Sequence, residues 1–373
     1  MNTLNDCIVR LIASAKSWIE GEAIRQLYAV AKLEGVCQAI GFPDLHPGKG
    51  TPVGAAFVTE DVIYPHLIGN DIGCGMGLWK TDLLRQKVKL DRWDDVQFDL
   101  EVPWHGDVRE RLELAGQEST AFDTAFGTLG GGNHFAEFQA VEKVASPSEF
   151  ERLGLSKNHL VLLVHSGSRG LGESVFRSHA AQHRAAGVDA GSAADYLAGH
   201  DLAVRWAKAS RALIAERFAS ALGAEVQPVL DIAHNWIQPK DGLWVHRKGG
   251  ATADEGPVVI AGSRGTHSYL VLPKGASQDT AWSLAHGSGR KYTRSASKAR
   301  VRERFRADEL THTPLGGRVI CEDRDLLYEE APMVYKNIET VIADLEVAGL
   351  IEVIATLRPV LTYKTRSDHY RRS

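Results

Sequence analysis

The chain of 373 residues contains only four cysteines, and they are widely spaced. This spacing is unlike the disulfide framework of a small secreted protein. No apolar run approaches the roughly 20 residues that a membrane-spanning helix needs. The first residues, Met1 to Asn5, are polar, and no apolar run with a small-residue cleavage site follows them. We therefore expect a cytoplasmic protein that does not contact a membrane.

Flexible linkers, sequence repeats and low-complexity segments are also lacking, which predicts a single domain over residues 1–373. The formal net charge is −4, which is unlike a protein that coats nucleic acid. Positive charge is concentrated in the segment 287–306, which holds eight Lys or Arg residues and one acid, Glu303. Such a run is either a solvated helix face or part of a local basic groove.

Apolar residues recur at helical or strand-like spacing along the whole chain. Helical spacing is found over residues 24–31, 193–222, 341–345 and 351–357. Strand-like runs cover residues 36–40, 53–58, 160–164, 226–232, 243–245, 257–261 and 269–272. The two kinds of element follow no strict βαβ rhythm. We therefore expect an α+β fold, a single large mixed α/β domain with a central pocket, and not a doubly wound sheet.

Histidine, cysteine and aspartate side chains stand beside glycines in several segments, some of them directly after a strand-like run. Glycine permits sharp turns and the close approach of a ligand, and active sites are commonly assembled in such loops. A single histidine is more often a structural residue than a ligand, but here several cases share one setting. These segments cover residues 70–75, 130–137, 165–172, 233–235 and 285–290.

Five of these side chains offer oxygen, thiolate and imidazole donors: Asp71, Cys74, His134, His165 and His234. That mixture suits Mn, Fe, Co or Zn better than Mg or Ca. The donors are too far apart in sequence for a small zinc finger. Because Asp71 and Cys74 are close in sequence and a thiolate can bridge two ions, a two-metal site for phosphoryl transfer is one interpretation. Ordinary structural residues are the other.

The glycine-rich loops at His165 and His286 each carry an arginine four residues later, Arg169 and Arg290. Backbone N–H groups together with a guanidinium can bind phosphate, although plain turns would have the same pattern. The sequence has no Walker A loop, no GxSxG elbow and no Rossmann fingerprint after a strand. Any nucleotide must therefore be bound in another way.

In order along the chain, these motifs resemble those of the RtcB-type RNA ligases, from about residue 36 to residue 364. The resemblance covers nearly the whole chain and does not rest on one motif. The series comprises Pro43-Asp44-Leu-His46, Asp71-Ile-Gly-Cys74-Gly, Gly-Gly-Gly-Asn133-His134-Phe-Ala-Glu137, His165-Ser-Gly-Ser-Arg169, Ala-His234-Asn235, Gly262-Ser-Arg-Gly-Thr-His-Ser268-Tyr, His286-Gly-Ser-Gly-Arg290, Glu330-Ala-Pro-Met-Val-Tyr335-Lys and Lys364.

The resemblance implies a GTP- and Mn²⁺-dependent ligase that joins an RNA 3′-phosphate, or a 2′,3′-cyclic phosphate opened to it, to a 5′-hydroxyl end. His286 would be the nucleophile that takes GMP from GTP. Cys74 would bridge two Mn²⁺ ions, with Asp71 and His134 on one ion and His165 and His234 on the other.

The resemblance also implies a nucleotide site. Asn133 would contact a phosphate, and Phe135 would pack near the guanine. The loop residues Gly287, Gly289 and Arg290 belong to the same site, and Asp44 lines it. Arg169 and the basic segment 287–306 could hold the RNA backbone. The residues implied to hold the guanine are Glu137, Ser268, Tyr335 and Lys364.

Several positions depart from the family pattern. Ser288 stands where many members have Ala, Arg264 where Met is common, and Thr365 where Gly is common. The stretch between His234 and His286 is short, which indicates a compact branch of the family. These departures bear on the choice of substrate more than on the chemistry.

Two other functions remain open at this point. The same metals could direct water at a cyclic phosphate, which would make the protein a phosphodiesterase or RNA end-processing enzyme. A non-catalytic RNA-binding homologue is the third possibility. An accessory activator protein is compatible with the ligase hypothesis, and the natural RNA could be tRNA, ribosomal RNA or messenger RNA.

Overall fold

The largest element of the structure, a computed structural model that describes residues 7–366, is an eight-stranded sheet. Neighbouring strands are antiparallel along its main path, and β16 (Arg318–Cys321) adds to β17 in parallel. This pattern fits the α+β expectation, since βαβ units would give parallel neighbours. In spatial order the main path contains β13 (Val258–Ile260), β14 (Ser268–Pro273), β17 (Ile351–Thr365), β6 (Phe135–Val144), β7 (His159–Ser166), β5 (Gly75–Leu84) and β9 (Val226–Ala233).

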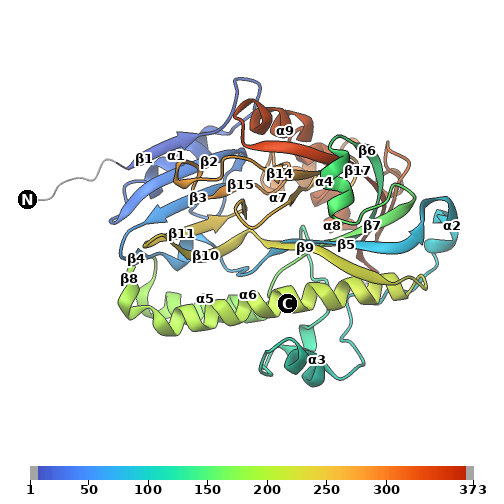
Figure 1. The fold of residues 1–373 in the computed structure, drawn as a ribbon, viewed down its shortest axis with the longest axis horizontal. Coiled ribbons are helices and arrows are strands. Elements are labelled where there is room, and N and C mark those ends of the chain that lie inside the picture. Colours follow the sequence, from blue (N-terminus) through green and yellow to red (C-terminus); the bar gives the residue numbers. More distant parts are fainter. Residues whose placement is uncertain (1–6, 367–373) are drawn as a thin grey trace, which may run out of the picture.

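A second sheet of five strands lies beside the first (Figure 1). Its β1 is parallel to β2, and the other neighbours are antiparallel. Strand β9 of the large sheet leads into β10 of the second sheet through His234, so the two sheets meet at that residue. The second sheet has the order β1 (Ile8–Leu11), β2 (Val36–His46), β3 (Val53–Thr59), β11 (Leu243–Lys248) and β10 (Asn235–Lys240). The smaller pairs are β12 (Gly250–Thr252) with β15 (Ser283–Ala285) and β4 (Val62–Ile63) with β8 (Val188–Asp189).

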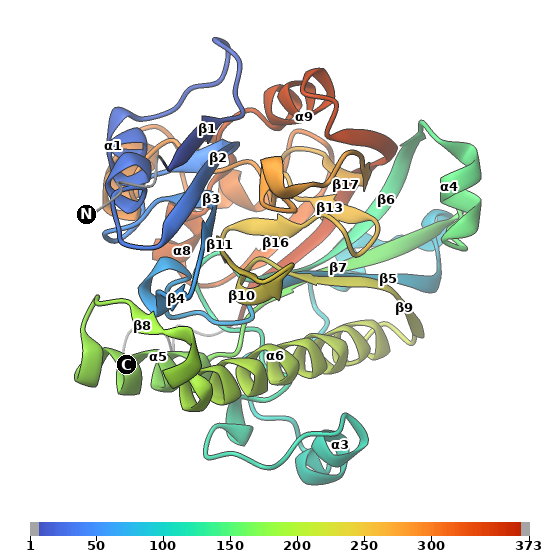
Figure 2. The same cartoon turned by 60° about the vertical axis from the view of Figure 1, so that its left-hand side comes forward.

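The long helix α6 (Ala194–Ser220) packs along the large sheet against β5, β7 and β9 (Figures 1 and 2). Its buried residues include Trp206, Leu213 and Phe218, as the Ala-rich apolar pattern predicts. Helix α3 (Val108–Leu114) lies on the side of α6 away from the sheet in both views. The other helices are α1 (Gly21–Val30), α2 (Leu90–Trp93), α4 (Pro147–Arg152), α5 (Gly170–His183), α7 (Arg294–Arg302), α8 (Arg324–Glu329) and α9 (Ile338–Val347).

An aromatic cluster fills the space between α6 and the large sheet. Phe138 of β6 stacks on Phe218 of α6 with ring centroids 4.7 Å apart, and Phe98 contacts both Phe218 and Tyr363. Such aromatic pairs contribute about 0.5–1.5 kcal/mol beyond the burial of their area. The sheet that carries the candidate site is therefore firmly held by the helix behind it.

Most predicted elements are confirmed, but the helix expected over residues 351–357 is wrong, because this segment begins β17. Ile351, Ile354 and Leu357 are spaced as on a helix, yet they lie in a strand between β14 and β6 that is buried along most of its length. Register shifts at Thr356/Leu357 and Pro359/Leu361 break the two-residue alternation that would reveal a strand. A buried, bulged strand thus resembles a helix in its apolar spacing.

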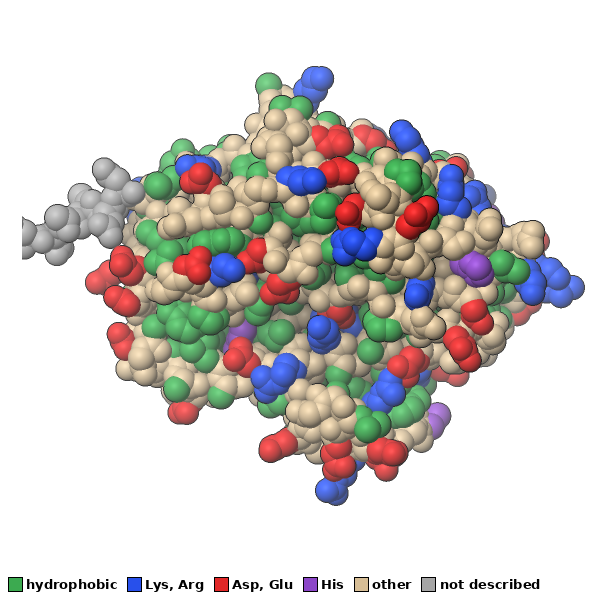
Figure 3. Space-filling view, in the orientation of Figure 1, with side chains coloured by type: hydrophobic (Ala, Val, Ile, Leu, Met, Phe, Trp, Pro, Cys, Tyr) green, Lys and Arg blue, Asp and Glu red, His purple; other side chains and the backbone are tan. Residues whose placement is uncertain are grey.

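Among residues 7–366, no helix is both long and apolar enough to cross a membrane. Residues Met1 to Asn5, on which the expectation of a cytoplasmic location partly rested, lie outside the described residues. On the face seen in Figure 3, acidic and basic side chains are interspersed, so this face offers no extended basic surface.

Candidate active site

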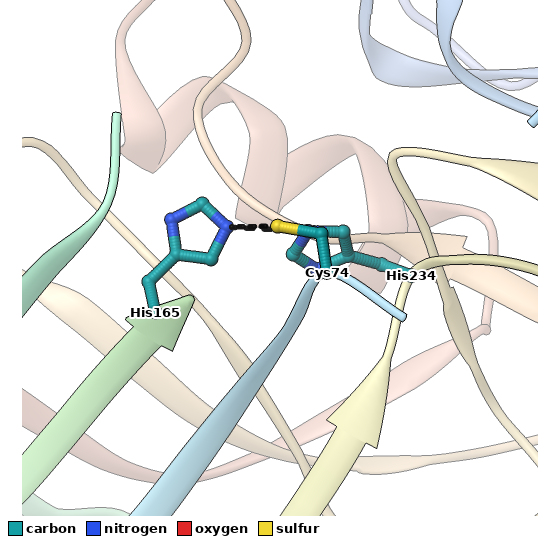
Figure 4. Close-up of side chains that lie close together, drawn as sticks. All are labelled: Cys74, His165 and His234. Carbon is teal, nitrogen blue, oxygen red and sulfur yellow. Dashed lines mark hydrogen bonds between the residues drawn. The ribbon is translucent and has the colours of Figure 1, made fainter. Parts of the chain in front are cut away.

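Strand pairing brings the predicted metal ligands to one edge of the large sheet. In the order β6, β7, β5, β9, neighbouring strands are antiparallel, so the beginnings of β6 and β5 lie beside the ends of β7 and β9. Phe135 pairs with His165, and Gly75 pairs with both Ser166 and Ala233. His134, Cys74 and His234 adjoin these pairs and His165 belongs to one, which places the donors together. Figure 4 shows Cys74, His165 and His234 converging from three strand ends.

The donors form two groups that share the sulfur of Cys74. One group contains Cys74, His165 and His234, and the other contains Asp71, Cys74 and His134. Cys74 Sγ lies 3.2 Å from His165 Nε2 and 3.5 Å from His134 Nε2. His165 Nε2 lies 3.2 Å from His234 Nε2, and His134 Nε2 lies 3.0 Å from Asp71 Oδ2. This division of five donors around one thiol is the one that the resemblance implies.

The ring orientations suit metal binding. His165 Nδ1 lies 3.3 Å from the carbonyl oxygen of Asn133, so Nδ1–H donates there and Nε2 is free to ligate. Burial lowers the pKa of both His165 and His234 well below the ordinary value, which keeps their rings neutral. Burial, with the nearby Asp71 carboxylate, raises the pKa of the Cys74 thiol. Two divalent cations at the sulfur would favour the thiolate and oppose that shift. Borderline first-row cations therefore fit this donor set.

Two further residues shape this edge, and no role was predicted for either of them. Arg211 of α6 is fully buried and donates to the carbonyl oxygens of Gly73 (2.8 Å) and Ser166 (2.7 Å). It also forms a two-pronged ion pair with Asp231 of β9, at 2.6 and 2.9 Å. Gly167 leaves room for the Asp71 carboxylate, because a Cβ there would lie 2.0 Å from Asp71 Oδ1 and would displace it. A charged residue on the buried face of an apolar helix was the signal that could have revealed Arg211.

His286 lies next to the metal ligands but belongs to a different part of the fold. It follows β15, and its ring centroid is 4.7 Å from that of His234. Asp44 Oδ2, at the end of β2, lies 2.8 Å from His286 Nδ1 and also accepts from the His286 backbone N–H. Nδ1–H therefore donates to Asp44, which leaves Nε2 with a lone pair. This pairing of a buried carboxylate with one imidazole nitrogen is how proteins orient a reactive histidine.

The strand end that carries Asp44 is itself fixed. Lys336 is buried and ends the Glu330–Lys336 motif, but no role was predicted for it. It donates to the carbonyl oxygens of Pro43 and Leu45 on either side of Asp44. Gly289 has a φ of +70°, and a Cβ there would lie 2.1 Å from the Asp44 carbonyl oxygen. The glycine-rich loop after His286 can therefore pass close to Asp44 only with glycine at that position.

Glu137 and Ser268 lie together, away from the metal ligands. Thr362 and Gln139 donate to the two Glu137 oxygens, and Gln139 also donates to Ser268 Oγ at 3.2 Å. Ser268 Oγ accepts a further bond from the Gly262 N–H at 3.1 Å, so its own hydroxyl hydrogen is left to donate. Burial raises the pKa of Glu137 to about 7 against these hydrogen bonds. Burial likewise lowers the pKa of Lys364 to about 8.

Arg290 is engaged within the protein. Its guanidinium pairs with Glu330 at 2.9 Å, donates to the Glu329 carbonyl oxygen at 2.8 Å, and lies over the Tyr335 ring at 5.2 Å. The Tyr335 hydroxyl donates to Glu330. These contacts fix Arg290 in the lining of the cleft. Phosphate binding by Arg290 stays a prediction.

A single cleft of about 1380 Å³ connects the candidate metal ligands and His286 with the group around Glu137 and Lys364. Behind its lining, Asp44 contacts His286, His134 contacts Asp71, and Ser268 contacts Gln139. Arg169 packs against Gly130 and influences Asp71 electrostatically, so it too stands beside the metal ligands. The predicted residues that line the cleft itself are Asp71, Cys74, Asn133, Phe135, Glu137, His165, His234, His286, Gly287, Gly289, Arg290, Tyr335 and Lys364.

Comparisons with known proteins agree with this geometry. The family model described as tRNA-splicing ligase RtcB matches residues 26–114 and 104–365. The RNA-splicing ligase RtcB2 of Escherichia coli is 45% identical over 365 residues, which covers 95% of this chain and 94% of that protein. The tRNA-splicing ligases RtcB of Thermococcus kodakarensis and Archaeoglobus fulgidus are 30% and 29% identical, over 91% and 92% of this chain and 90% and 91% of theirs. The chain therefore belongs to the RtcB family of RNA-splicing ligases.

Proposed function

We propose that this RNA ligase joins an RNA 3′-phosphate, or a 2′,3′-cyclic phosphate opened to it, to a 5′-hydroxyl, using GTP and two Mn²⁺ ions. The observation that carries the proposal is the position of His286. Its ring lies 4.7 Å from that of His234, a metal-ligand candidate, and Asp44 holds its Nδ1–H. A nucleophile beside a two-metal donor set is what nucleotidyl transfer requires.

In the first step, His286 Nε2 attacks the α-phosphorus of GTP. A P–N bond forms, the bond from the α-phosphorus to the bridging oxygen breaks, and pyrophosphate leaves. Because the ring still holds the proton on Nδ1, it becomes positively charged, and the buried Asp44 carboxylate balances that charge. Asp71, Cys74, His134, His165 and His234 would hold two Mn²⁺ ions, which supply charge neutralisation for the phosphates.

In the second step, an oxygen of the RNA 3′-phosphate attacks the phosphorus of the bound GMP, and the P–N bond to His286 breaks. The product is a mixed anhydride between the RNA 3′-phosphate and GMP. In the third step, the 5′-hydroxyl of the other RNA end attacks the RNA phosphorus and GMP leaves. Activation is needed because a free phosphate monoester would otherwise have to expel hydroxide or oxide, which are poor leaving groups.

One arm of the cleft is lined by Glu137, Tyr335 and Lys364, with Ser268 behind this lining. We assign the base of the nucleotide to this arm. An ionised Glu137 can accept from N1–H and N2–H of guanine, while Lys364 can donate to O6. Asn133 lies at the junction between this arm and the metal ligands, where it could contact a phosphate, and Phe135 lines the cleft nearby.

We further propose that the basic segment 287–306 binds the RNA backbone. Asp325 pairs with both Lys298 and Arg302, so its single carboxylate offsets part of their charge. Among the described residues, Lys291, Arg294 and Arg300 form no salt bridge, and the first two line the cleft. Such unbalanced cations give RNA binding that is sensitive to salt and has little sequence preference.

The test is covalent labelling. The purified full chain is incubated with α-labelled GTP and Mn²⁺, denatured, and examined for label on the protein. We expect acid-labile label on the wild type and none on His286→Ala. His312→Ala, which removes an exposed histidine, is the matched control and should label normally. Normal labelling of His286→Ala would refute the proposal.

A second measurement separates ligation from end processing. RNA with a 2′,3′-cyclic phosphate is offered together with a 5′-hydroxyl RNA, GTP and Mn²⁺. Joined product supports the ligase mechanism. An opened 3′-phosphate end without joined product would instead favour a metal-dependent phosphodiesterase.

A further inference from the structure

Arg264 lies in the loop between β13 and β14 and lines the cleft, although only 6% of the residue is exposed. Its Nη2 donates to the carbonyl oxygen of Leu327 at 2.7 Å. Its Nε and Nη1 atoms are buried and have no hydrogen-bond partner within residues 7–366. Buried donors without an acceptor are rare and costly in folded proteins, so this side chain calls for an acceptor from outside the chain.

The carboxylates around Arg264 are already engaged by other groups. Glu330 is paired with Arg290 and accepts from Tyr335. Glu137 accepts from Gln139 and Thr362. Neither carboxylate satisfies the Arg264 guanidinium, even though both influence it electrostatically.

This arm of the cleft also contains more cations than carboxylates. Arg264, Arg290 and Lys364 face Glu137 and Glu330, and all five side chains are largely buried. A ligand that presents acceptor atoms to Arg264 would satisfy its donors and would reduce this imbalance.

We propose that Arg264 reads the O6/N7 edge of the nucleotide base and thereby adds to the selection of guanine over adenine that Glu137 and Lys364 provide. Guanine presents two acceptors on that edge, whereas adenine places its N6 amino donor where guanine has O6. Glu137 would then bind the N1–H and N2–H groups, so that cation and carboxylate contact different edges of one base. This inference rests on the proposed function, because it assumes that the arm binds a guanine nucleotide.

The experiment measures the equilibrium binding of GMP, 7-deaza-GMP and AMP to the full chain in the presence of Mn²⁺. The variants are Arg264→Met, which removes the donors at similar length, and Arg264→Lys, which keeps the charge. Arg324→Met, at an exposed arginine of α8, is the matched control. Thermal unfolding of each variant establishes that it is folded.

We expect the wild type and Arg324→Met to bind GMP about 10- to 100-fold more tightly than 7-deaza-GMP, which lacks the N7 acceptor. Arg264→Met should bind these two ligands within about twofold of each other and should show a smaller preference for GMP over AMP, because Glu137 and Lys364 still favour guanine. Arg264→Lys should fall between these limits. The readout is binding, so it does not depend on ligation activity.

Two results would overturn the inference. Equal binding of GMP and 7-deaza-GMP by the wild type would show that nothing reads N7. A GMP preference in folded Arg264→Met as large as in the wild type would show that another residue does so. The failure of the proposed function looks different, because the wild type would then bind none of the nucleotides and would not be labelled by GTP.

Discussion

Glu137 should make the protein less stable at neutral pH than it would be with an uncharged residue in its place. The side chain is 3% exposed, and burial raises its pKa from 4.5 to about 7. Glu137→Gln keeps the shape but has no charge to desolvate. The amide oxygen can accept from Gln139, and its NH₂ group can donate to the hydroxyl of Thr362.

The magnitude follows from proton linkage, at about 1.4 kcal/mol for each pH unit between the folded and unfolded pKa. For a carboxyl group whose pKa moves from 4.5 to about 7, the free energy is about 3 kcal/mol. The folded chain holds this proton more tightly, so stability falls as the pH rises through that interval. Above it the full cost is present, and below it the cost vanishes.

The assay compares the free energy of unfolding of wild type and Glu137→Gln by denaturant titration over a series of pH values. The difference between the two proteins isolates Glu137, because other titrating groups cancel. We expect the variant to gain stability relative to the wild type as the pH rises, by up to about 3 kcal/mol at pH 8. Glu113→Gln, at an exposed ion pair, should stay within about 0.5 kcal/mol at every pH. A difference between wild type and Glu137→Gln that does not change with pH would refute the reasoning.

The same variant should bind GMP more weakly, since an amide cannot accept from both N1–H and N2–H of guanine. A gain in stability together with a loss of nucleotide affinity is the signature of a residue retained for binding. It also predicts that the wild type loses GMP affinity as the pH falls below about 7, where Glu137 takes up its proton. Glu137→Gln should not show this dependence.

Three further predictions concern the other parts of the site. Asp44→Asn removes the charge beside His286, so covalent GMP attachment should slow by about 100-fold or more, measured by rapid-quench labelling. Cys74→Ser should lower the Mn²⁺ content from two ions per chain, measured by metal analysis after gel filtration; an unchanged content would contradict a bridging sulfur. Arg300→Ala should reduce the slope of log RNA affinity against log salt by about 0.7, whereas Arg109→Ala on α3 should not.

The predicted metal ligands lie together because each of them is at or near a point where a regular strand begins or ends, and their binding of metal stays a prediction. Glycines close to Cys74, His165 and Asn133 indicate turns at these positions. Antiparallel pairing then brings strand beginnings and ends to one edge, so residues far apart in sequence become neighbours. The pattern indicated the candidate donors, while the register determines which of them lie close together.

Residues that act by supporting others were harder to find. Arg211 and Lys336 are buried cations that donate to backbone carbonyl oxygens, and nothing in their local sequence reveals those acceptors. Their partners lie tens to hundreds of residues away along the chain. The error at residues 351–357 has a related origin, since bulges in β17 arise from pairing with β6 and β14 and not from the segment itself.

The site divides between two parts of the fold, and this division can be tested by separating metal binding from nucleotidyl transfer. The large sheet supplies the candidate metal ligands, whereas Asp44 lies near the end of β2 in the second sheet and His286 follows β15. The two parts meet where β9 passes into β10 at His234. Asp44→Asn should therefore retain both Mn²⁺ ions while losing covalent GMP attachment. If Asp44→Asn also lost Mn²⁺, the two parts would not be independent, and Asp44 would serve the metal site as well as His286.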